Sequence, residues 1–210
     1  MAVINIDRMP DFYHTLAKAR VIIIGNGPSA LEGNHGDTID RFDAVIRINN
    51  YVIEGLETHV GSRTDIWVNG ANQGLKKRTN IPDNILVMIP PEVLRHKGDA
   101  IHARINKRLG TSDYVMLPLE TMVELETSSG LQRPTTGFFA IYFFHKLGFD
   151  ITLHGFDFFT GSKGHYFDHP ITSWLKDNGI IKKATKHDLS GEKAFIEGLI
   201  EAGMLRRLEP

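Results

Sequence analysis

The chain of 210 residues contains no cysteine, no long apolar run and no excess of charge of either sign. Without cysteine there is no disulfide, no thiolate metal ligand and no cysteine nucleophile, and the composition suits a reducing compartment. A formal net charge of −1 gives no electrostatic reason to expect a nucleic acid as partner. No run approaches the ~20 apolar residues of a spanning helix, and the first ten residues lack the features of a secretory signal. We therefore expect a cytoplasmic protein without a transmembrane segment.

The remaining composition is ordinary for a globular domain, with 41% hydrophobic and 23% charged residues. A chain of this length can bury a core without cross-links. No repeat, low-complexity tract or long linker divides it, so we expect a single domain over 1–210, with 1–19 as an N-terminal extension. Residues 162–186 mix aromatic, histidine, glycine and lysine residues without a period. A long irregular stretch in a compact domain is usually functional, which favours an active-site lid here.

Short, mostly unbroken apolar runs predict the strands, and longer periodic segments predict the helices. The expected strands are 21–25, 44–49, 65–69, 84–89, 114–117 and 150–155. The expected helices are 91–109, 119–127, 136–147 and an amphipathic tail over 190–208. Unbroken apolar strands are typical of a parallel sheet covered on both faces. The alternation therefore predicts an α/β fold with three α/β/α layers and a mostly parallel, Rossmann-like sheet.

The first strand runs into a glycine-bearing turn, "VIIIGNGPSA". Gly25 and Gly27 let backbone approach another group closely, and Asn26 offers hydrogen-bond donors and an acceptor. Open α/β sheets bind ligands beyond the carboxyl ends of their strands. The spacing matches neither the dinucleotide fingerprint nor the phosphate-binding loop of nucleotide hydrolases, which disfavours a dinucleotide oxidoreductase. The turn indicates either a nucleotide or phosphate site or a plain tight turn.

Two further segments offer polar groups at element ends. The strand 44–49 delivers Arg47, Asn49 and Asn50 to its end, where amides suit recognition of a base or ribose; ordinary turn chemistry is the alternative. Thr135, Thr136 and Gly137 stand where the buried helix 136–147 begins. Free amide groups there suit an anion, although a simple helix cap explains the same residues.

Histidines gather toward the C-terminal end of the chain. "GHYFDH" contains His165 and His169, and "HDLSGE" places His187 five residues before Glu192. A histidine can act as a general base or as a phosphate partner. A zinc site and ordinary surface histidines remain as alternatives, although no H-E-x-x-H pattern occurs. Glu192 is more suited to capping or orienting than to reacting, because acidic residues are common in a first helical turn.

Four segments in order resemble the sialyl motifs of the eukaryotic-type sialyltransferases, glycosyltransferase family 29. "VIIIGNGPSALEGNHGDTIDRFDAVIRINNYVIEGLETHVGSRTDIWVNG" resembles the long motif, and "RPTTGFFAIYFFHKLGFDITLHGFDFF" resembles the short motif. "GHYFD" resembles the third motif and "HDLSGE" the very short motif. The "GNGPS" turn is also similar to bacterial sialyltransferases of family 42, but "VGSRT" and "HDLSGE" favour family 29.

The resemblance implies a GT-A-like fold and inverting transfer of a sialic-acid-type nonulosonic acid from a CMP-activated donor to a glycan hydroxyl, without metal or other cofactor. It implies that His187 is the general base and that His165 binds the departing phosphate. The donor-binding residues that it implies are Gly25, Asn26, Asn49, Thr135, Thr136, Gly137, Gly155, Phe156 and, in the third motif, Tyr166.

The sequence also departs from the family pattern. Eukaryotic members are longer, with a membrane anchor and a cysteine pair joining the long and short motifs. The departures indicate a compact bacterial or viral-type member, cytoplasmic and at most peripheral to membrane glycan machinery. Two alternatives stay open: a CMP-Kdo-dependent transferase on the same fold, and a nucleotide-binding module without activity.

Overall fold

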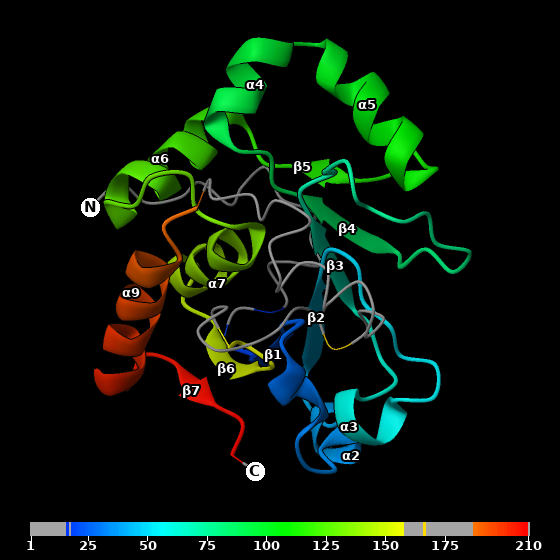
Figure 1. Ribbon diagram of the computed structural model, residues 1–210, viewed down its shortest axis with the longest axis vertical. Helices are drawn as coiled ribbons and strands as arrows, with labels where there is room; N and C mark the ends of the chain where they lie inside the picture. The colour runs from blue at the N-terminus through cyan, green and yellow to red at the C-terminus, as the bar shows by residue number, and fades with distance from the viewer. Residues whose placement is uncertain (1–15, 17, 158–165, 167–186, 210) are drawn as a thin grey trace, which may run out of the picture.

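The computed structural model describes residues 16, 18–157, 166 and 187–209, and its centre is one parallel sheet (Figure 1). In this part of the chain the sheet has seven strands in the order β5-β4-β3-β2-β1-β6-β7, and every neighbouring pair is parallel. The strands are β1 Arg20–Ile24, β2 Ala44–Ile48, β3 Ile66–Asn69, β4 Asn84–Val87, β5 Val115–Met116, β6 Asp150–His154 and β7 Arg206–Arg207. The predicted parallel α/β architecture is confirmed.

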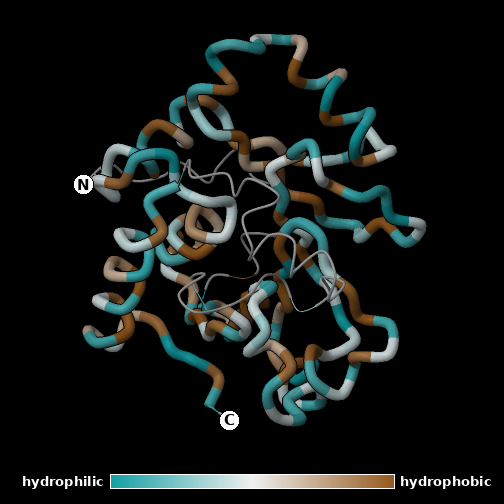
Figure 2. Tube along the Cα trace, in the orientation of Figure 1, coloured by the Kyte–Doolittle hydropathy of each residue, from teal (hydrophilic) through white to brown (hydrophobic). Residues whose placement is uncertain are grey.

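The sheet is buried on both faces, which explains why its strands are unbroken apolar runs. Val21 and Ile23 of β1 face the larger hydrophobic core. Ile22 and Ile24 face a smaller cluster with Ile39 of the short helix α2, Gly36–Ile39. Alternate side chains of one strand therefore enter different layers. Figure 2 shows the hydrophobic residues concentrated in the strands and in the helix α7, Thr136–Lys146.

Helix α7 is the most deeply buried helix in this arrangement. Every residue from Phe138 to Phe144 is buried, and α7 packs against β2, β3 and β6. A helix that is apolar all round is stable only inside a protein, so its sequence predicts its position. Around it lie α6, Leu119–Ser129, and α9, Leu189–Glu201, as Figure 1 shows.

Two of the predicted helices differ from the structure. The segment 91–109 forms two helices, α4 Pro91–Lys97 and α5 Ala100–Leu109, because the chain turns at Gly98 with φ +48°. The Gly98 N–H donates to the Leu94 carbonyl at 3.0 Å and ends α4. The tail is helical only to Glu201 and then adds β7 to the edge of the sheet beside β6. Three short helical turns, η1 Pro28–Leu31, α2 and α3 Glu57–Val60, were not predicted.

Arg47 of β2 is fully buried and holds the loop before β3. Its guanidinium donates to the carbonyls of Val60 (2.7 Å), Gly61 (3.0 Å) and Arg63 (3.0 Å) and to the Thr64 hydroxyl (3.0 Å). Burial lowers the pKa of Arg47. These four oxygen atoms occupy its Nε and one terminal nitrogen, while the other terminal nitrogen is buried without a partner.

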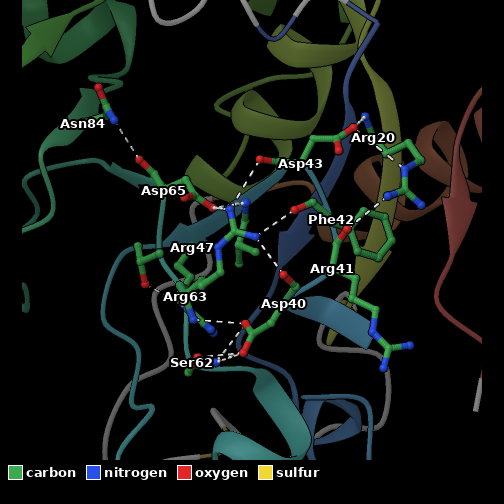
Figure 3. A network of polar contacts seen from close by, with 12 residues as sticks. Arg20, Asp40, Arg41, Phe42, Asp43, Arg47, Ser62, Arg63, Asp65 and Asn84 are labelled. Atoms are coloured by element: carbon green, nitrogen blue, oxygen red, sulfur yellow. Dashed lines mark hydrogen bonds and ion pairs between the residues drawn. The ribbon is translucent and has the colours of Figure 1, made fainter. Parts of the chain in front are cut away.

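A second polar network joins the end of α2 to the start of β3 (Figure 3). The Asp40 carboxylate accepts hydrogen bonds from the Ser62 amide (2.9 Å), the Ser62 hydroxyl (2.7 Å) and the Arg63 amide (3.1 Å). The Arg63 guanidinium donates to the carbonyls of Asp40 (2.7 Å) and Phe42 (2.9 Å) and pairs with the Asp65 carboxylate at 2.9 Å. In this network Ser62, Arg63 and Asp65 of "GSRTD" hold the loop before β3 in place.

None of the helices in the described part of the chain is both long and apolar enough to cross a membrane. Most of the predicted N-terminal extension, 1–19, and all of the predicted lid, 162–186, except Tyr166 lie outside the described residues. The extension, the lid and the single-domain assignment stay predictions. Leu16 is buried in the core.

Asp40→Asn is expected to lower the free energy of unfolding at pH 7 by about 1–2 kcal/mol, because charge-assisted hydrogen bonds at a partly exposed site are lost. Burial raises the pKa of Asp40, but the hydrogen bonds from Ser62 and Arg63 and the charge of Arg47 outweigh it and lower the pKa. The stabilisation is therefore present above about pH 4 and disappears as the pH falls through the lowered folded-state pKa.

Urea unfolding at a series of pH values measures this effect. Asp37→Asn is the control, since Asp37 is an exposed carboxylate of α2, the helix that Asp40 follows. Equal stability of the two variants at pH 7 would contradict the role of Asp40.

Candidate active site

The strand order creates a natural ligand position at the ends of β1 and β6. From β1 the chain moves outward through β2 to β5 and then returns to β6 on the other side of β1. In open α/β sheets, ligands bind outside the carboxyl ends of the strands at such a switch point. The predicted donor-binding residues Gly25 and Gly155 lie here, each directly after its strand.

The glycines at this edge allow the two strand ends to approach each other closely. Gly25 donates to the His154 carbonyl at 2.7 Å, and Gly27 donates to the Gly155 carbonyl at 2.8 Å. A Cβ atom on Gly25 would lie 2.3 Å from the Gly155 carbonyl oxygen, and one on Gly27 would lie 2.3 Å from Asp157. The close contact between the two strand ends is therefore one reason why glycine stands at these positions. The sequence alone did not reveal this reason.

Asn26 connects the ends of β1 and β2, and its side-chain oxygen has no hydrogen-bond partner. The Asn26 side-chain NH2 group donates to the Ile48 carbonyl at 2.8 Å. The Asn26 backbone carbonyl accepts from the Tyr166 backbone amide at 3.0 Å. The Tyr166 hydroxyl donates to the Val52 carbonyl at 2.7 Å. The Asn26 Oδ1 atom is buried without a hydrogen-bond partner. Such atoms are rare in folded proteins, so this oxygen is a candidate to accept a ligand's hydrogen bond.

Asn49 directly follows β2, and Asn69 is the last residue of β3. Asn49 adopts a left-handed conformation with φ +52°, and its Oδ1 atom accepts from the Gly70 amide at 3.1 Å. A Cβ on Gly70 would lie 2.8 Å from the Thr136 hydroxyl, which places α7 beside these strand ends. Asn69 is fully buried, and its Nδ2 atom has no partner. Sequence reasoning missed Asn69 as a candidate, although it stands at a strand end next to that of Asn49.

The N-terminus of α7 points to the same edge, and Thr135 is its cap. The Thr135 hydroxyl accepts from the Phe138 amide at 3.1 Å and donates to Glu192 at 2.7 Å. The Thr135 amide donates to the other Glu192 oxygen at 2.7 Å. A Cβ on Gly137 would lie 3.4 Å from the Phe156 ring, so these two predicted residues are neighbours. The first-turn amides of α7 remain the groups suited to an anion.

Glu192 holds this helix end from α9 and is 3% exposed. Burial raises the pKa of Glu192, while the two hydrogen bonds from Thr135 act in the opposite direction. The sequence predicted that Glu192 caps or orients. In the structure its carboxylate holds the N-terminus of α7 through Thr135. Asp188 is the cap of α9, since its carboxylate accepts from the Gly191 amide at 2.9 Å.

His187 is exposed, and its ring is oriented by the backbone near α7. Its Nδ1 atom lies 2.6 Å from the Arg133 carbonyl oxygen. A carbonyl only accepts, so Nδ1 carries the hydrogen and Nε2 of the neutral ring presents its lone pair. Arg133 is two residues before Thr135, which places His187 beside the α7 N-terminus. This tautomer is the one that a general base acting through Nε2 requires.

The structure thus brings together the described candidates, from Gly25 and Asn26 to Thr136 and His187, around one end of the sheet. His165 and His169 lie outside the described residues, so the phosphate role of His165 stays a prediction. Among the residues with described positions, no group of three or more histidines and acidic residues is arranged to hold a metal ion. The ligand contacts assigned to individual residues also stay predictions.

Comparison with known proteins gives a family match over most of the chain. The model of glycosyltransferase family 29 (sialyltransferase) matches residues 12–92 and 112–204. The type 2 lactosamine α-2,3-sialyltransferases of Mus musculus and Rattus norvegicus are 24% and 25% identical over 90% and 93% of this chain. The chain spans 64% and 66% of the length of these two relatives.

Solved structures show the same fold at low sequence identity. A mammalian sialyltransferase superposes with a TM-score of 0.65 at 20% identity, covering 90% of this chain and 68% of that one. The sialyltransferase CstII from Campylobacter jejuni, solved with cytidine-5'-monophosphate, gives 0.55 at 18% identity and covers 92% of this chain and 81% of that one. These similarities confirm the predicted GT-A-like α/β/α fold.

Glu192→Gln is expected to lower the free energy of unfolding by about 1–3 kcal/mol. The carboxylate accepts two hydrogen bonds from Thr135, whereas a glutamine must turn its NH2 group toward one of those donors. Denaturant unfolding measures the loss, and Glu201→Gln on the exposed end of α9 is the control. A glutamine variant as stable as the control would show that this contact does not hold α7.

Proposed function

Since this chain belongs to glycosyltransferase family 29, the sialyltransferases, we propose that it transfers a sialic-acid-type sugar from a CMP-activated donor to a hydroxyl of a glycan acceptor. The observation that carries this proposal is the position of His187, whose Nε2 lone pair is available beside the α7 N-terminus. A nucleotide-binding module without activity has no need for an oriented imidazole at that place. We place the reaction in the cytoplasm, in keeping with a chain free of cysteine.

The donor nucleotide lies in this proposal over the ends of β1 and β6. The partnerless Asn26 Oδ1 suits an amino group such as the exocyclic amine of cytosine. Phe156, packed against Gly137, offers a ring beside the α7 N-terminus. The helix amides attract the phosphate, because a helix N-terminus carries unsatisfied donors and a partial positive charge.

The reaction breaks the bond between the sugar's anomeric carbon and the phosphate oxygen. The electron pair leaves with CMP, whose developing charge is stabilised by the α7 N-terminus and, as predicted, by His165. The acceptor hydroxyl gives its proton to His187 Nε2 and forms the new bond from the opposite face, which inverts the anomeric centre. We propose that no metal takes part, because the sequence contains no Asp-x-Asp pattern to hold one beside the phosphate.

His187→Ala is expected to lower sialyl transfer about 10²- to 10⁴-fold, the usual contribution of a general base, while the CMP affinity stays near wild type. CMP release from CMP-sialic acid with a galactose-terminated acceptor measures the rate, and calorimetry measures CMP binding. His96→Ala, at an exposed histidine of α4, is the control. Loss of CMP binding without a catalytic defect would contradict the base assignment. Turnover of CMP-Kdo in place of CMP-sialic acid would replace the proposed sugar.

Sialyl transfer is expected to continue in EDTA, since His165 and a helix end take the place of a cation at the leaving phosphate. The rate is measured before and after dialysis against the chelator, and again after Mg²⁺ or Mn²⁺ is restored. A loss that either cation reverses would overturn the metal-free mechanism.

A further inference from the structure

Two arginines converge on one backbone carbonyl at the border of the candidate site. Arg104 and Arg108, one turn apart on α5, both donate to the carbonyl oxygen of Ala71, the Arg104 bond measuring 3.3 Å. Ala71 follows Gly70, whose backbone packs against Thr136 of α7. The two guanidinium groups are therefore placed where β3 ends, two strands from β1.

Within the described part of the chain, no acidic side chain pairs with either of these arginines. Helix α5 itself contains no acidic residue. Burial and the charge of Arg104 both lower the pKa of Arg108, which reflects the repulsion between the two groups. The adjoining segment 71–82 contains Lys76, Lys77 and Arg78 and no acidic residue, although the whole chain has a net charge of −1.

A purely structural role does not account for both arginines. Arg47 and Arg78 also have one buried nitrogen each without a partner, but Arg47 donates to four oxygen atoms, and Arg78 stacks on the Tyr51 ring at 3.7 Å. Arg104 and Arg108 share a single oxygen, and the buried Nε atom of Arg104 has no partner. A guanidinium has five N–H donors in a planar fork, so the pair keeps several donors for another group.

We infer that Arg104 and Arg108 form a subsite for an anionic group, a phosphate or a carboxylate, carried by the glycan acceptor. Paired guanidinium forks match the oxygen atoms of such groups with two hydrogen bonds each. The inference rests on the proposed transfer reaction, in which the single phosphate of the donor occupies the α7 N-terminus. A second cationic pair beside the same site then serves the other substrate.

The test measures binding of galactose and galactose 6-phosphate by calorimetry in saturating CMP, which fills the donor site. The phosphorylated sugar is expected to bind at least tenfold more tightly. Arg104→Gln and Arg108→Gln, singly and together, are expected to remove most of this difference, and Arg108→Lys part of it. Arg95→Gln, at an exposed arginine of α4, should leave it unchanged. The single and lysine variants keep the test valid if the double variant does not fold.

Equal affinity for the two sugars, or a difference that survives both glutamine substitutions, would overturn the subsite. Inorganic phosphate binding as tightly as galactose 6-phosphate would overturn its assignment to a glycan. Binding to 3:1 phosphatidylcholine–phosphatidylglycerol vesicles that both substitutions abolish, without any preference for the phosphorylated sugar, would assign the arginines to a lipid surface instead. Because this test measures binding without turnover, it is independent of the transfer assay. If the protein prefers galactose 6-phosphate but does not transfer sialic acid, the proposed reaction is refuted and the anion subsite is retained.

Discussion

The candidate site depends on the contact between the buried Glu192 carboxylate and Thr135. This contact joins residues 57 positions apart and fixes the beginning of α7 against α9. The apolar side chains of α7 drive its burial in the core but do not fix its direction, because hydrophobic packing is not directional. The polar contact with Glu192 fixes the position of the α7 N-terminus. The same contact brings His187 to the Arg133 carbonyl. Two of the sialyl motifs are thus one structural unit, in which the start of α7 and the proposed base His187 lie side by side.

The opposite wall of the site is built by backbone proximity. Gly25 and Gly155 approach so closely that a side chain on either would meet its neighbour. Asn26 and Asn49 then use part of their amides to hold adjacent strand ends, and Asn26 keeps one buried oxygen unused. These residues have a role in the fold whether or not they bind a ligand, so their presence in a motif does not by itself establish a binding role. The Arg47 and Asp40 networks hold the loop between α3 and β3 and complete this support.

The strands and α7 were predictable because their signals are strong and local. The run at 21–24 is apolar on both faces, 44–48 is apolar except for the buried Arg47, and Thr135 precedes a helix with no polar face. The break at Gly98 was not predicted, since a glycine inside a helical pattern does not by itself distinguish a tolerated residue from a left-handed cap. The edge strand β7 has only two residues, both arginines, and forms through pairing with β6. The burial of Arg47 and the reach of Glu192 to α7 are tertiary contacts that a single sequence does not encode locally.

The central claim is that the ends of β1 and β6 and the start of α7 bind a cytidine monophosphate ester. A crystal structure with CMP tests it most directly. The account predicts the phosphate at the first-turn amides of α7 and the cytosine within hydrogen-bond distance of Asn26 Oδ1. CMP bound at the amino ends of the strands, or on a surface that touches neither Asn26 nor α7, would contradict it.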